Sequence, residues 1–204
     1  MVHNLFIIGI AGASGSGKTY LMEKIKNKVK KLLCDIETIS CDNYYYENDT
    51  LNKDLPSSLE LSLLVEHINM LKNGETVEIP EYNFITQKRV YNKNKVIDGS
   101  KIKVLIVEGL FVLYDEKIRN ILNLKLFTHL DEDITLARRI DRDTRERNKT
   151  FINVIDEYQS FVKPAFISII KPSMIHADMI ISTSENTDDT IYLDLIIQYI
   201  KCKL

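Results

Sequence analysis

The fold follows from one stretch, Gly12-Ala13-Ser14-Gly15-Ser16-Gly17-Lys18-Thr19, which matches the phosphate-binding pattern G-x-x-x-x-G-K-[ST] of a P-loop. An apolar run of strand length, Leu5–Ile10, precedes this stretch, and Thr19–Leu33 carries apolar residues at helical spacing. Strand, glycine-rich loop and helix in this order are the context that the motif requires. Glycines let successive backbone N–H groups turn toward one anion, and the helix N-terminus adds a partial positive charge there.

The motif therefore predicts that the chain binds a nucleoside triphosphate. Lys18 would reach the β- and γ-phosphates, and the Thr19 hydroxyl would complete the coordination of Mg²⁺. The residues expected around the triphosphate are those of the loop and of the first turn of the helix. They are Gly12, Ala13, Ser14, Gly15, Ser16, Gly17, Lys18, Thr19 and Tyr20.

Short apolar runs rich in β-formers alternate with helical patterns along the chain. The runs are Leu5–Ile10, Glu37–Ser40, Lys101–Val107, Lys125–Leu130 and Met179–Ser182. The helical patterns are Thr19–Leu33, Ser57–Lys72, Glu116–Leu122, Asp133–Arg147, Phe151–Ile170 and Thr187–Ile200. This alternation predicts an α/β fold of the P-loop NTPase type, with a mostly parallel sheet and helices on both faces. One stretch, residues 75–96, breaks the alternation and predicts a projecting β-hairpin. We expect a single domain over residues 1–204.

Composition and charge exclude several classes of protein. The chain of 204 residues is 45% apolar and 27% charged, which is ordinary for a globular α/β protein. A net charge of −2 disfavours a general nucleic-acid or membrane-surface binder. No apolar stretch reaches the length of a membrane span, and the N-terminal run is too short for a signal peptide. The three cysteines, Cys34, Cys41 and Cys202, lack C-x-x-C spacing and are typical of a reducing compartment, so we expect a cytoplasmic protein.

Two acidic residues follow predicted strands, where ligands of parallel α/β sheets bind. Glu108 comes directly after the buried run Lys103–Val107, and a carboxylate at that place in a P-loop protein can hold Mg²⁺. A solvated Glu in a turn gives the same pattern. Asp42 follows the second strand and is placed to accept a proton from a substrate hydroxyl. An Asp after a strand is also typical of a helix cap or an Asx-turn.

A basic cluster within Ile134–Arg147 is the third feature. Its arginines are Arg138, Arg139, Arg142, Arg145 and Arg147. Guanidinium groups placed over a P-loop stabilise the charge that spreads onto the phosphoryl oxygens during transfer. A surface helix with i,i+4 pairs such as Asp141 with Arg145 explains most of these arginines individually. Because the arginines outnumber the nearby acids, the cluster as a whole predicts a lid at about residues 134–150.

In order and spacing, these motifs resemble the uridine kinase (uridine–cytidine kinase) family over nearly the whole chain. The segments that carry the resemblance are Ala11–Thr19, Ser40–Tyr45, Asp54–Pro56, Pro80–Phe84, Val107–Gly109, Asp131–Arg147, Phe161–Pro164, Lys171–Ser173 and Ala177–Ile181. The resemblance implies ATP- and Mg²⁺-dependent phosphorylation of the 5′-hydroxyl of uridine or cytidine, in pyrimidine salvage. It also implies a homo-oligomer, with a tetramer as the expected form, and no nucleic-acid or membrane partner.

The resemblance further implies which residues perform the chemistry. Asp42 would be the general base at the 5′-hydroxyl, and Thr19 and Glu108 would arrange Mg²⁺. Lys18 would carry the developing charge, together with arginines of the lid. These arginines are Arg139, Arg142 and Arg147.

In the same way, the resemblance implies which residues bind the nucleoside. Asp54 and Arg139 would hold the ribose hydroxyls, whereas Tyr82 and Phe84 on the hairpin would contact the base. The residues alone leave other interpretations open. Asp54 stands before Pro56, which is typical of a turn, and the spacing of the two aromatic residues is equally typical of packing within a hairpin.

The chain departs from the family pattern at four places, most of them in the predicted nucleoside pocket. Asn83 replaces an Asp, and Gln87 replaces a His that helps recognise the pyrimidine, although its amide can still pair with a base edge. Asn148 and Lys149 replace a Gly-Arg pair, and Glu157 replaces a Gln. Gln87, Lys149 and Glu157 remain predicted substrate-binding residues, but the identity of the acceptor is less firmly implied than the kinase chemistry.

Two other functions remain open. A phosphoribulokinase-like or pantothenate-kinase-like protein would keep the P-loop fold and phosphorylate another small alcohol. The second alternative is a non-catalytic nucleotide-binding module or a GTPase switch. However, residues 52–54, Asn-Lys-Asp, have the wrong spacing for the N-K-x-D motif that recognises guanine. Lys18, Thr19 and Asp42 are all present, and this favours an active kinase.

Overall fold

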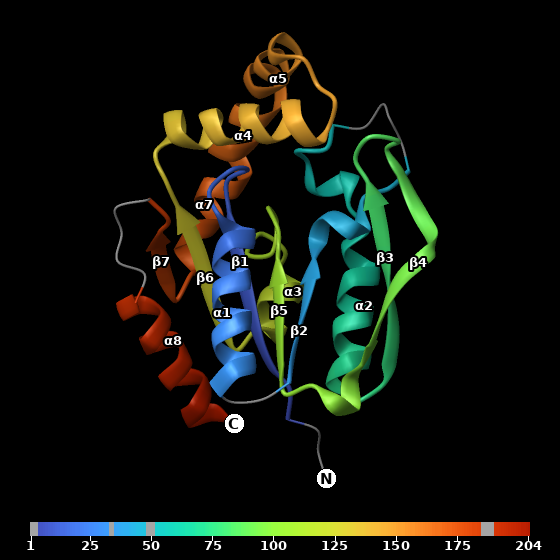
Figure 1. The fold of residues 1–204 in the computed structure, drawn as a ribbon, viewed down its shortest axis with the longest axis vertical. Coiled ribbons are helices and arrows are strands. Elements are labelled where there is room, and N and C mark those ends of the chain that lie inside the picture. Colours follow the sequence, from blue (N-terminus) through green and yellow to red (C-terminus); the bar gives the residue numbers. More distant parts are fainter. Residues whose placement is uncertain (1–3, 33–34, 48–51, 185–189) are drawn as a thin grey trace.

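A parallel α/β sheet forms the centre of the protein, as the sequence predicts (Figure 1). The computed structural model describes residues 4–32, 35–47, 52–184 and 190–204. The sheet has five strands in the order β2-β5-β1-β6-β7, and each neighbouring pair is parallel. They are β1 (Phe6–Gly12), β2 (Ile36–Ser40), β5 (Val104–Glu108), β6 (Leu124–His129) and β7 (Met179–Ser182). All five carboxyl ends therefore lie at one edge of the sheet, which we call the carboxyl edge.

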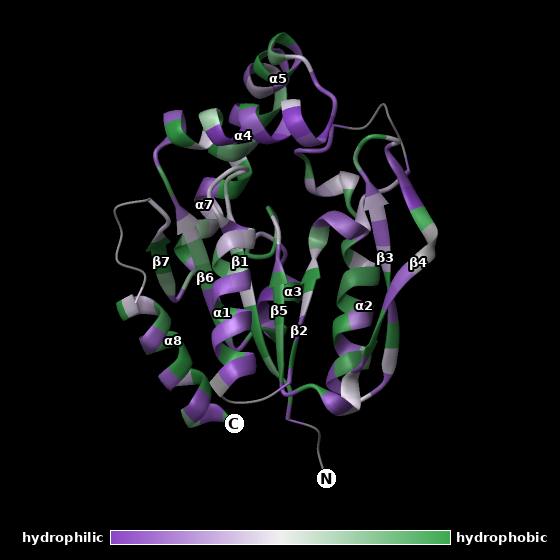
Figure 2. Cartoon of the chain, viewed as in Figure 1, coloured by the Kyte–Doolittle hydropathy of each residue, from purple (hydrophilic) through white to green (hydrophobic). Residues whose placement is uncertain are grey.

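Helices connect the strands and cover both faces of the sheet. They are α1 (Lys18–Leu32), α2 (Leu61–Lys72), α3 (Glu116–Ile121), α4 (Glu132–Glu146), α5 (Phe151–Glu157), α6 (Lys163–Ala165), α7 (Lys171–Ser173) and α8 (Thr190–Lys203). The antiparallel strands β3 (Thr76–Asn83) and β4 (Lys88–Asp98) form the predicted hairpin, which packs on α2. Figure 1 shows α4 and α5 beyond the carboxyl edge, and Figure 2 shows that α4 is largely hydrophilic, unlike strand β5.

The central strand β1 divides the hydrophobic core into two layers. Its seven residues are all buried, and their side chains alternate between the two faces of the sheet. Ile8 and Ile10 pack in the layer that contains α1 and α8. Ile7 and Ala11 pack in the other layer, against residues of α2, α3 and the hairpin. Because both faces are covered, the strand is apolar throughout, as parallel strands usually are.

The helix predicted over Ser57–Lys72 begins later, at Leu61. Pro56–Ser58 form a separate 3₁₀ turn, and Leu59 is extended, with φ −112° and ψ 140°. Leu59 pairs with Tyr45 in an isolated antiparallel bridge. This tertiary pairing, which helical periodicity cannot report, separates the turn from the helix.

The strand predicted from Lys101 begins later too, at Val104. Gly99–Lys101 form a 3₁₀ turn that the Asp98 side chain caps by accepting a hydrogen bond from the Ser100 N–H at 3.1 Å. Local capping therefore overrides the β-propensity of these residues.

The helical segment predicted over Phe151–Ile170 continues as far as His176 and contains two π-helical stretches. These stretches are Tyr158–Val162 and Phe166–Ile170, and each precedes a Lys-Pro pair. Proline has no N–H and its ring crowds the carbonyl four residues earlier, so a wider turn relieves the clash.

Some sequence predictions fall outside the described residues. Leu33 and Cys34 do so, as do the first residues of the helix predicted over Thr187–Ile200, which is described from Thr190. Among the residues that are described, no helix is both long and apolar enough to cross a membrane.

The P-loop packs directly against α4 through Gly15. This glycine has φ +83°, in the left-handed region, and a Cβ at its position would lie 2.5 Å from the Thr135 carbonyl oxygen of α4. Gly74, after α2, has nearly the same φ of +81°, but a Cβ there would approach nothing closer than 3.9 Å. Gly15 is thus needed for both conformation and space, whereas Gly74 is needed for conformation alone.

We predict that Gly15→Ala destabilises the protein more than Gly74→Ala. Both variants pay about 1–2 kcal/mol for an L-residue in the left-handed region. Gly15→Ala also forces the α4 backbone away from the loop, so it should lower the unfolding temperature further and weaken binding of a nucleoside triphosphate. Thermal unfolding with and without the nucleotide measures both effects. Equal losses in the two variants would show that the loop is not held against α4.

Candidate active site

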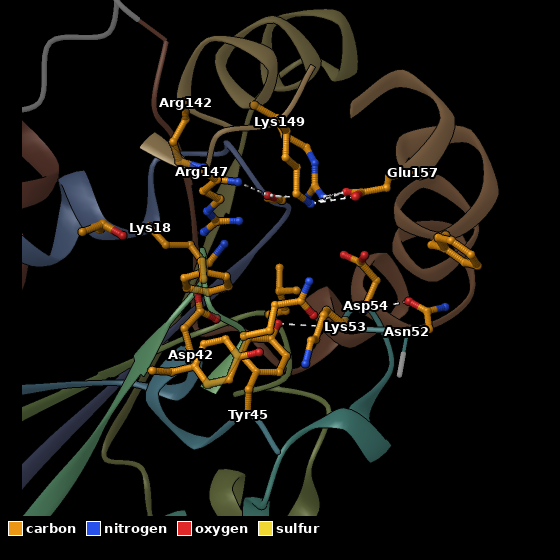
Figure 3. A pocket seen from close by; sticks show the side chains of 18 of the residues that line it. Lys18, Asp42, Tyr45, Asn52, Lys53, Asp54, Arg142, Arg147, Lys149 and Glu157 are labelled. Atoms are coloured by element: carbon orange, nitrogen blue, oxygen red, sulfur yellow. Dashed lines mark hydrogen bonds and ion pairs between the residues drawn. The ribbon is translucent and has the colours of Figure 1, made fainter. Parts of the chain in front are cut away.

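A cavity of about 430 Å³ opens at the carboxyl edge of the sheet, under α4 (Figure 3). Its walls come from the P-loop, the segments after β2 and β5, the hairpin, α4 and α5. The cavity brings together the residues that the sequence predicts for catalysis and for acceptor binding. These are Lys18, Thr19, Asp42, Asp54, Tyr82, Phe84, Gln87, Glu108, Arg139, Arg142, Arg147, Lys149 and Glu157.

Hydroxyl groups from β6 and from the segment after β7 fix the P-loop. The Ser16 hydroxyl donates to the Ala13 carbonyl at 2.8 Å and lies 2.6 Å from the Thr128 hydroxyl. The Thr183 hydroxyl donates to the Ser16 carbonyl at 2.6 Å. The sequence analysis did not identify Thr128 or Thr183, because a single threonine near a strand end carries no local pattern.

The ammonium of Lys18 is folded back onto the loop. Its Nζ donates to the carbonyls of Gly12 at 3.2 Å and Ala13 at 2.8 Å. Burial lowers the pKa of Lys18, while the nearby carboxylates of Glu108 and Asp42 oppose that shift. An anion beside the ammonium would favour its charged form. A phosphate bound beside Lys18 would therefore keep its ammonium charged.

Tyr20, also predicted near the triphosphate, is not among the residues that line the cavity. Its ring is 49% exposed on α1, and the Lys24 ammonium lies 5.1 Å from the ring centroid.

Two carboxylates lie beside Lys18 at the ends of neighbouring strands. Glu108 is only 6% exposed, so it is not a solvated turn residue, and it accepts a hydrogen bond from the Ser40 hydroxyl at 2.8 Å. Burial raises the pKa of Glu108, and the charge of Asp42 raises it further. Ser40, not Asp42, caps the following 3₁₀ turn, because its side chain accepts from the Asp42 N–H. The Asp42 carboxylate instead borders the cavity (Figure 3).

The oxygen donors around Lys18 suit a magnesium ion. The Thr19 hydroxyl and the Glu108 carboxylate are hard ligands of the kind that Mg²⁺ prefers. A divalent cation beside Glu108 would stabilise its charged form, which burial and Asp42 disfavour. The described residues include no cluster of three or more His, Cys, Asp or Glu that could hold a metal.

A buried carboxylate, Asp143, holds three arginines of the predicted lid together. Its oxygens lie 2.8 Å from Arg142 Nε, 3.4 Å from Arg147 NH1 and 3.4 Å from Arg139 Nε. Burial alone would raise the pKa of Asp143, but the three guanidinium groups outweigh burial and lower it. Arg139 and Arg142 also donate to the Ser14 hydroxyl at 3.0 and 3.2 Å. The cluster thus joins α4 to the P-loop, and the i,i+4 spacing around Asp143 was a signal that the sequence analysis missed.

The other two arginines of the cluster lie outside the cavity lining. Arg145 is exposed and pairs with Asp141 at 2.8 Å, which is the surface i,i+4 pair that the sequence also allowed. Both terminal nitrogens of Arg138 lie 3.4 Å from the Thr183 carbonyl oxygen.

Aromatic rings from the hairpin form one wall of the cavity. Tyr82 and Phe84 pack edge to face, with centroids 5.2 Å apart, and both contact the Tyr45 ring. The Arg147 guanidinium lies 3.7 Å from the Phe84 centroid, so it covers that ring. The two aromatic residues therefore both pack the hairpin and line the cavity.

Arg89 on β4, also missed from the sequence, fastens the hairpin to the segment that carries Asp42. Its guanidinium donates to the carbonyls of Tyr45 and Tyr44, each at 3.1 Å. The same group pairs with Glu60 at 2.8 Å. These contacts join the hairpin that carries the aromatic wall to the segment that carries Asp42.

Acidic and basic side chains alternate at the end of the cavity away from Lys18. Asp54 is 8% exposed, and burial raises its pKa while Arg139 opposes that shift. Asn52 makes the local turn by accepting from the Asp54 N–H at 2.9 Å, so the Asp54 carboxylate is left to line the cavity. Lys149 Nζ lies 2.7 and 2.6 Å from the two Glu157 oxygens (Figure 3). Two of the departures from the family pattern are thus partners of one another.

The remaining departures have separate local roles. The Asn83 side chain accepts from the N–H groups of Ile85 and Thr86 at 2.8 and 3.0 Å, so it forms the hairpin turn. Asn148 has φ +54°, and Asn is among the non-glycine residues that adopt this conformation most readily. Gln87 has φ +55° and lines the cavity.

Comparison with known proteins gives a consistent result. The model of the family described as "Phosphoribulokinase / Uridine kinase family" matches residues 7–190. A protein from Klebsiella pneumoniae named "Uridine kinase" is 38% identical over 191 residues, covering 89% of this chain and 88% of that protein. An Arabidopsis thaliana protein named "Uridine kinase-like protein 5" is 35% identical over 98% of this chain, which spans only 43% of that longer protein. The solved "Possible Uridine Kinase" from Bacillus stearothermophilus shares the fold with a TM-score of 0.58 at 16% identity, over 87% of this chain and 88% of that one.

We predict that Asp143→Asn destabilises the protein at neutral pH by roughly 2–4 kcal/mol, because three guanidinium groups lose a shared buried anion. The folded-state pKa of Asp143 is lowered, so its stabilisation is present at neutral pH and is lost as the pH falls below about 4. The difference in the free energy of unfolding between wild type and variant (the gap) should therefore narrow in acid. Urea unfolding at several pH values measures the gap, with Asp141→Asn as the exposed control on the same helix. A gap that does not change with pH would contradict the assignment.

Proposed function

Since the chain belongs to the phosphoribulokinase/uridine kinase family and is a kinase of that family, we propose that it transfers the γ-phosphoryl group of ATP to the 5′-hydroxyl of uridine or cytidine. The observation that carries the proposal is the position of Asp42 between two chemically different ends of one cavity. Asp42 lines the same cavity as Lys18 and Glu108, which form its phosphate end. Tyr45 and Asp54 line that cavity at the other end. A group in this place can take a proton from an acceptor while the triphosphate lies on the P-loop.

The transfer uses side chains that the protein holds in place before the reaction. The Asp42 carboxylate accepts the proton of the 5′-hydroxyl, whose oxygen forms the new bond to the γ-phosphorus. The bond from that phosphorus to the β,γ-bridging oxygen breaks, and ADP leaves. Lys18 and Arg142 neutralise the charge that spreads over the phosphoryl oxygens. Bound Mg²⁺, held by Thr19 and Glu108, would supply further charge neutralisation.

The acceptor end provides groups for a ribose and a planar base. The Asp54 carboxylate can accept hydrogen bonds from two neighbouring hydroxyls, and Arg139 offers a fork of donors beside it. Tyr82 and Phe84 provide a flat apolar wall, and the Gln87 amide can both donate and accept at a base edge. The names of the similar proteins, which are uridine kinases, support the choice of a pyrimidine nucleoside.

We predict that ADP release with Mg²⁺-ATP depends on uridine or cytidine and yields the nucleoside monophosphate. The test is an acceptor panel of uridine, cytidine, deoxycytidine, adenosine, pantothenate and ribulose 5-phosphate, with a blank lacking acceptor and products identified by mass. Turnover of only a non-nucleoside alcohol would reassign the acceptor. No acceptor-dependent release from protein that binds ATP would overturn the kinase assignment.

We further predict that Asp42→Asn lowers turnover by roughly 10²–10⁴-fold, because the amide keeps the shape of the side chain but cannot take the proton. ATP binding should stay nearly unchanged, since the P-loop is intact. Steady-state kinetics and nucleotide titration separate the two effects, with Asp141→Asn as a control for loss of a carboxylate outside the cavity. If turnover is unchanged, Asp42 is not the base.

A further inference from the structure

The Lys149–Glu157 pair is built from two ordered elements at the acceptor end of the cavity. The left-handed Asn148 reverses the chain after α4, so that the Lys149 N–H donates to the Asp143 carbonyl at 3.2 Å. Thr150 then caps α5 by accepting from the Asn153 N–H at 3.2 Å. Glu157 is the last residue of that helix. Both side chains therefore start from backbone that is fixed by hydrogen bonds.

The Lys149 ammonium and the Glu157 carboxylate form a close ion pair. Lys149 Nζ lies within 2.7 Å of both Glu157 oxygens, so a large part of its positive charge is already compensated. Side-chain exposures of 28% and 35% mean that the pair faces the cavity and is not deeply buried. Nζ retains a third N–H, and the carboxylate retains lone pairs. The pair can therefore still bind neutral hydroxyl groups.

The other cations at this end also have partners. Arg139 is bound by Asp143 at 3.4 Å and lies 3.6 Å from Glu157. The Lys53 ammonium lies 5.5 and 5.2 Å from the ring centroids of Tyr45 and Tyr82. Asp54, which is 8% exposed, adds a second carboxylate to that of Glu157 at this end. A phosphate or carboxylate that entered here would meet two carboxylates, Asp54 and Glu157, before it met an unpaired cation.

From this arrangement we propose that Lys149 and Glu157 act as one specificity-determining pair. Because Glu157 compensates the positive charge of Lys149, that charge does not attract an anionic acceptor, and the kinase is restricted to uncharged polyhydroxyl acceptors. The proposal rests on the proposed function, because that function assigns this end of the cavity to the acceptor. It deepens that function by excluding sugar phosphates and carboxylate-bearing alcohols as a class. Repulsion between like charges, together with the pairing of the cations described at this end, is the physical basis of the selection.

The test removes the acidic partner and asks whether an anion then binds. Glu157→Gln keeps the size of the side chain but leaves the Lys149 charge uncompensated. Ribulose 5-phosphate is the probe, because it carries a hydroxyl at one end and a phosphate at the other. Binding is measured by calorimetry with a saturating non-hydrolysable ATP analogue, so that the probe cannot occupy the P-loop. We expect roughly tenfold tighter binding to Glu157→Gln than to wild type, the size of one charge-assisted contact.

Two further proteins make the interpretation specific. The double variant Glu157→Gln with Lys149→Met has a neutral pair, and its affinity for ribulose 5-phosphate should return to that of wild type. Asp141→Asn releases the exposed Arg145 on the same helix, outside the cavity lining, and should not change probe binding. Uridine affinity should not rise in any variant, because uridine carries no charge. Thermal unfolding and binding of the ATP analogue check that each variant is folded.

Two results would overturn the proposal. One is unchanged affinity of folded Glu157→Gln for ribulose 5-phosphate. The other is equally tight binding by the single and the double variant, which would mean that repulsion by Glu157 acts alone and that Lys149 has no part. Neither measurement needs turnover of a nucleoside. Failure of the proposed function would appear separately, as wild-type protein that forms no nucleoside monophosphate in the acceptor panel.

Discussion

The active-site geometry depends on the register of four parallel strands. β1 pairs with β5 so that Ile10 lies opposite Glu108, and with β6 so that Gly12 lies opposite Thr128. β2 pairs with β5 so that Ser40 lies opposite Glu108. A slip of one residue would turn each of these side chains to the other face of the sheet. The two apolar layers on either side of β1 prevent such a slip, so the hydrophobic core fixes the positions of the catalytic groups.

A second level of order comes from charge compensation. Three guanidinium groups close to one another would repel, and the fully buried Asp143 offsets that repulsion from behind the cavity. This lets α4 present Arg139 and Arg142 to the P-loop hydroxyl of Ser14. At the opposite end of the cavity, Glu157 compensates the charge of Lys149. The cavity therefore holds several cations, and buried or half-buried carboxylates compensate part of their charge.

Periodicity and strand-end position are local signals, and they were enough to predict the elements, the P-loop and the places of Asp42 and Glu108. The predicted residues of the acceptor end came instead from the family resemblance. Local sequence was not enough for contacts between distant elements. The Thr128 and Thr183 hydroxyls reach the loop only through the register of β6 and β7, and no pattern near either residue indicates it. Arg89 and Glu60 meet because the hairpin packs on the segment after β2. The late start of α2 has the same kind of cause, since a bridge from Leu59 to Tyr45 competes with helix formation.

The departures from the family pattern show why residues in a binding cavity are better interpreted in pairs. Taken singly, Glu157 adds a negative charge to the acceptor end, and Lys149 replaces a planar guanidinium with a compact ammonium. Only the change to Glu157 alters the charge, and a carboxylate in a partly buried space is costly unless a cation pairs with it. Lys149 supplies that cation, and the chain between the two residues starts at the left-handed Asn148. The sequence reveals each substitution, but only the path of the backbone shows that the two form one interaction. The added carboxylate lies in direct contact with the Lys149 ammonium, so the pair as a whole carries no net charge.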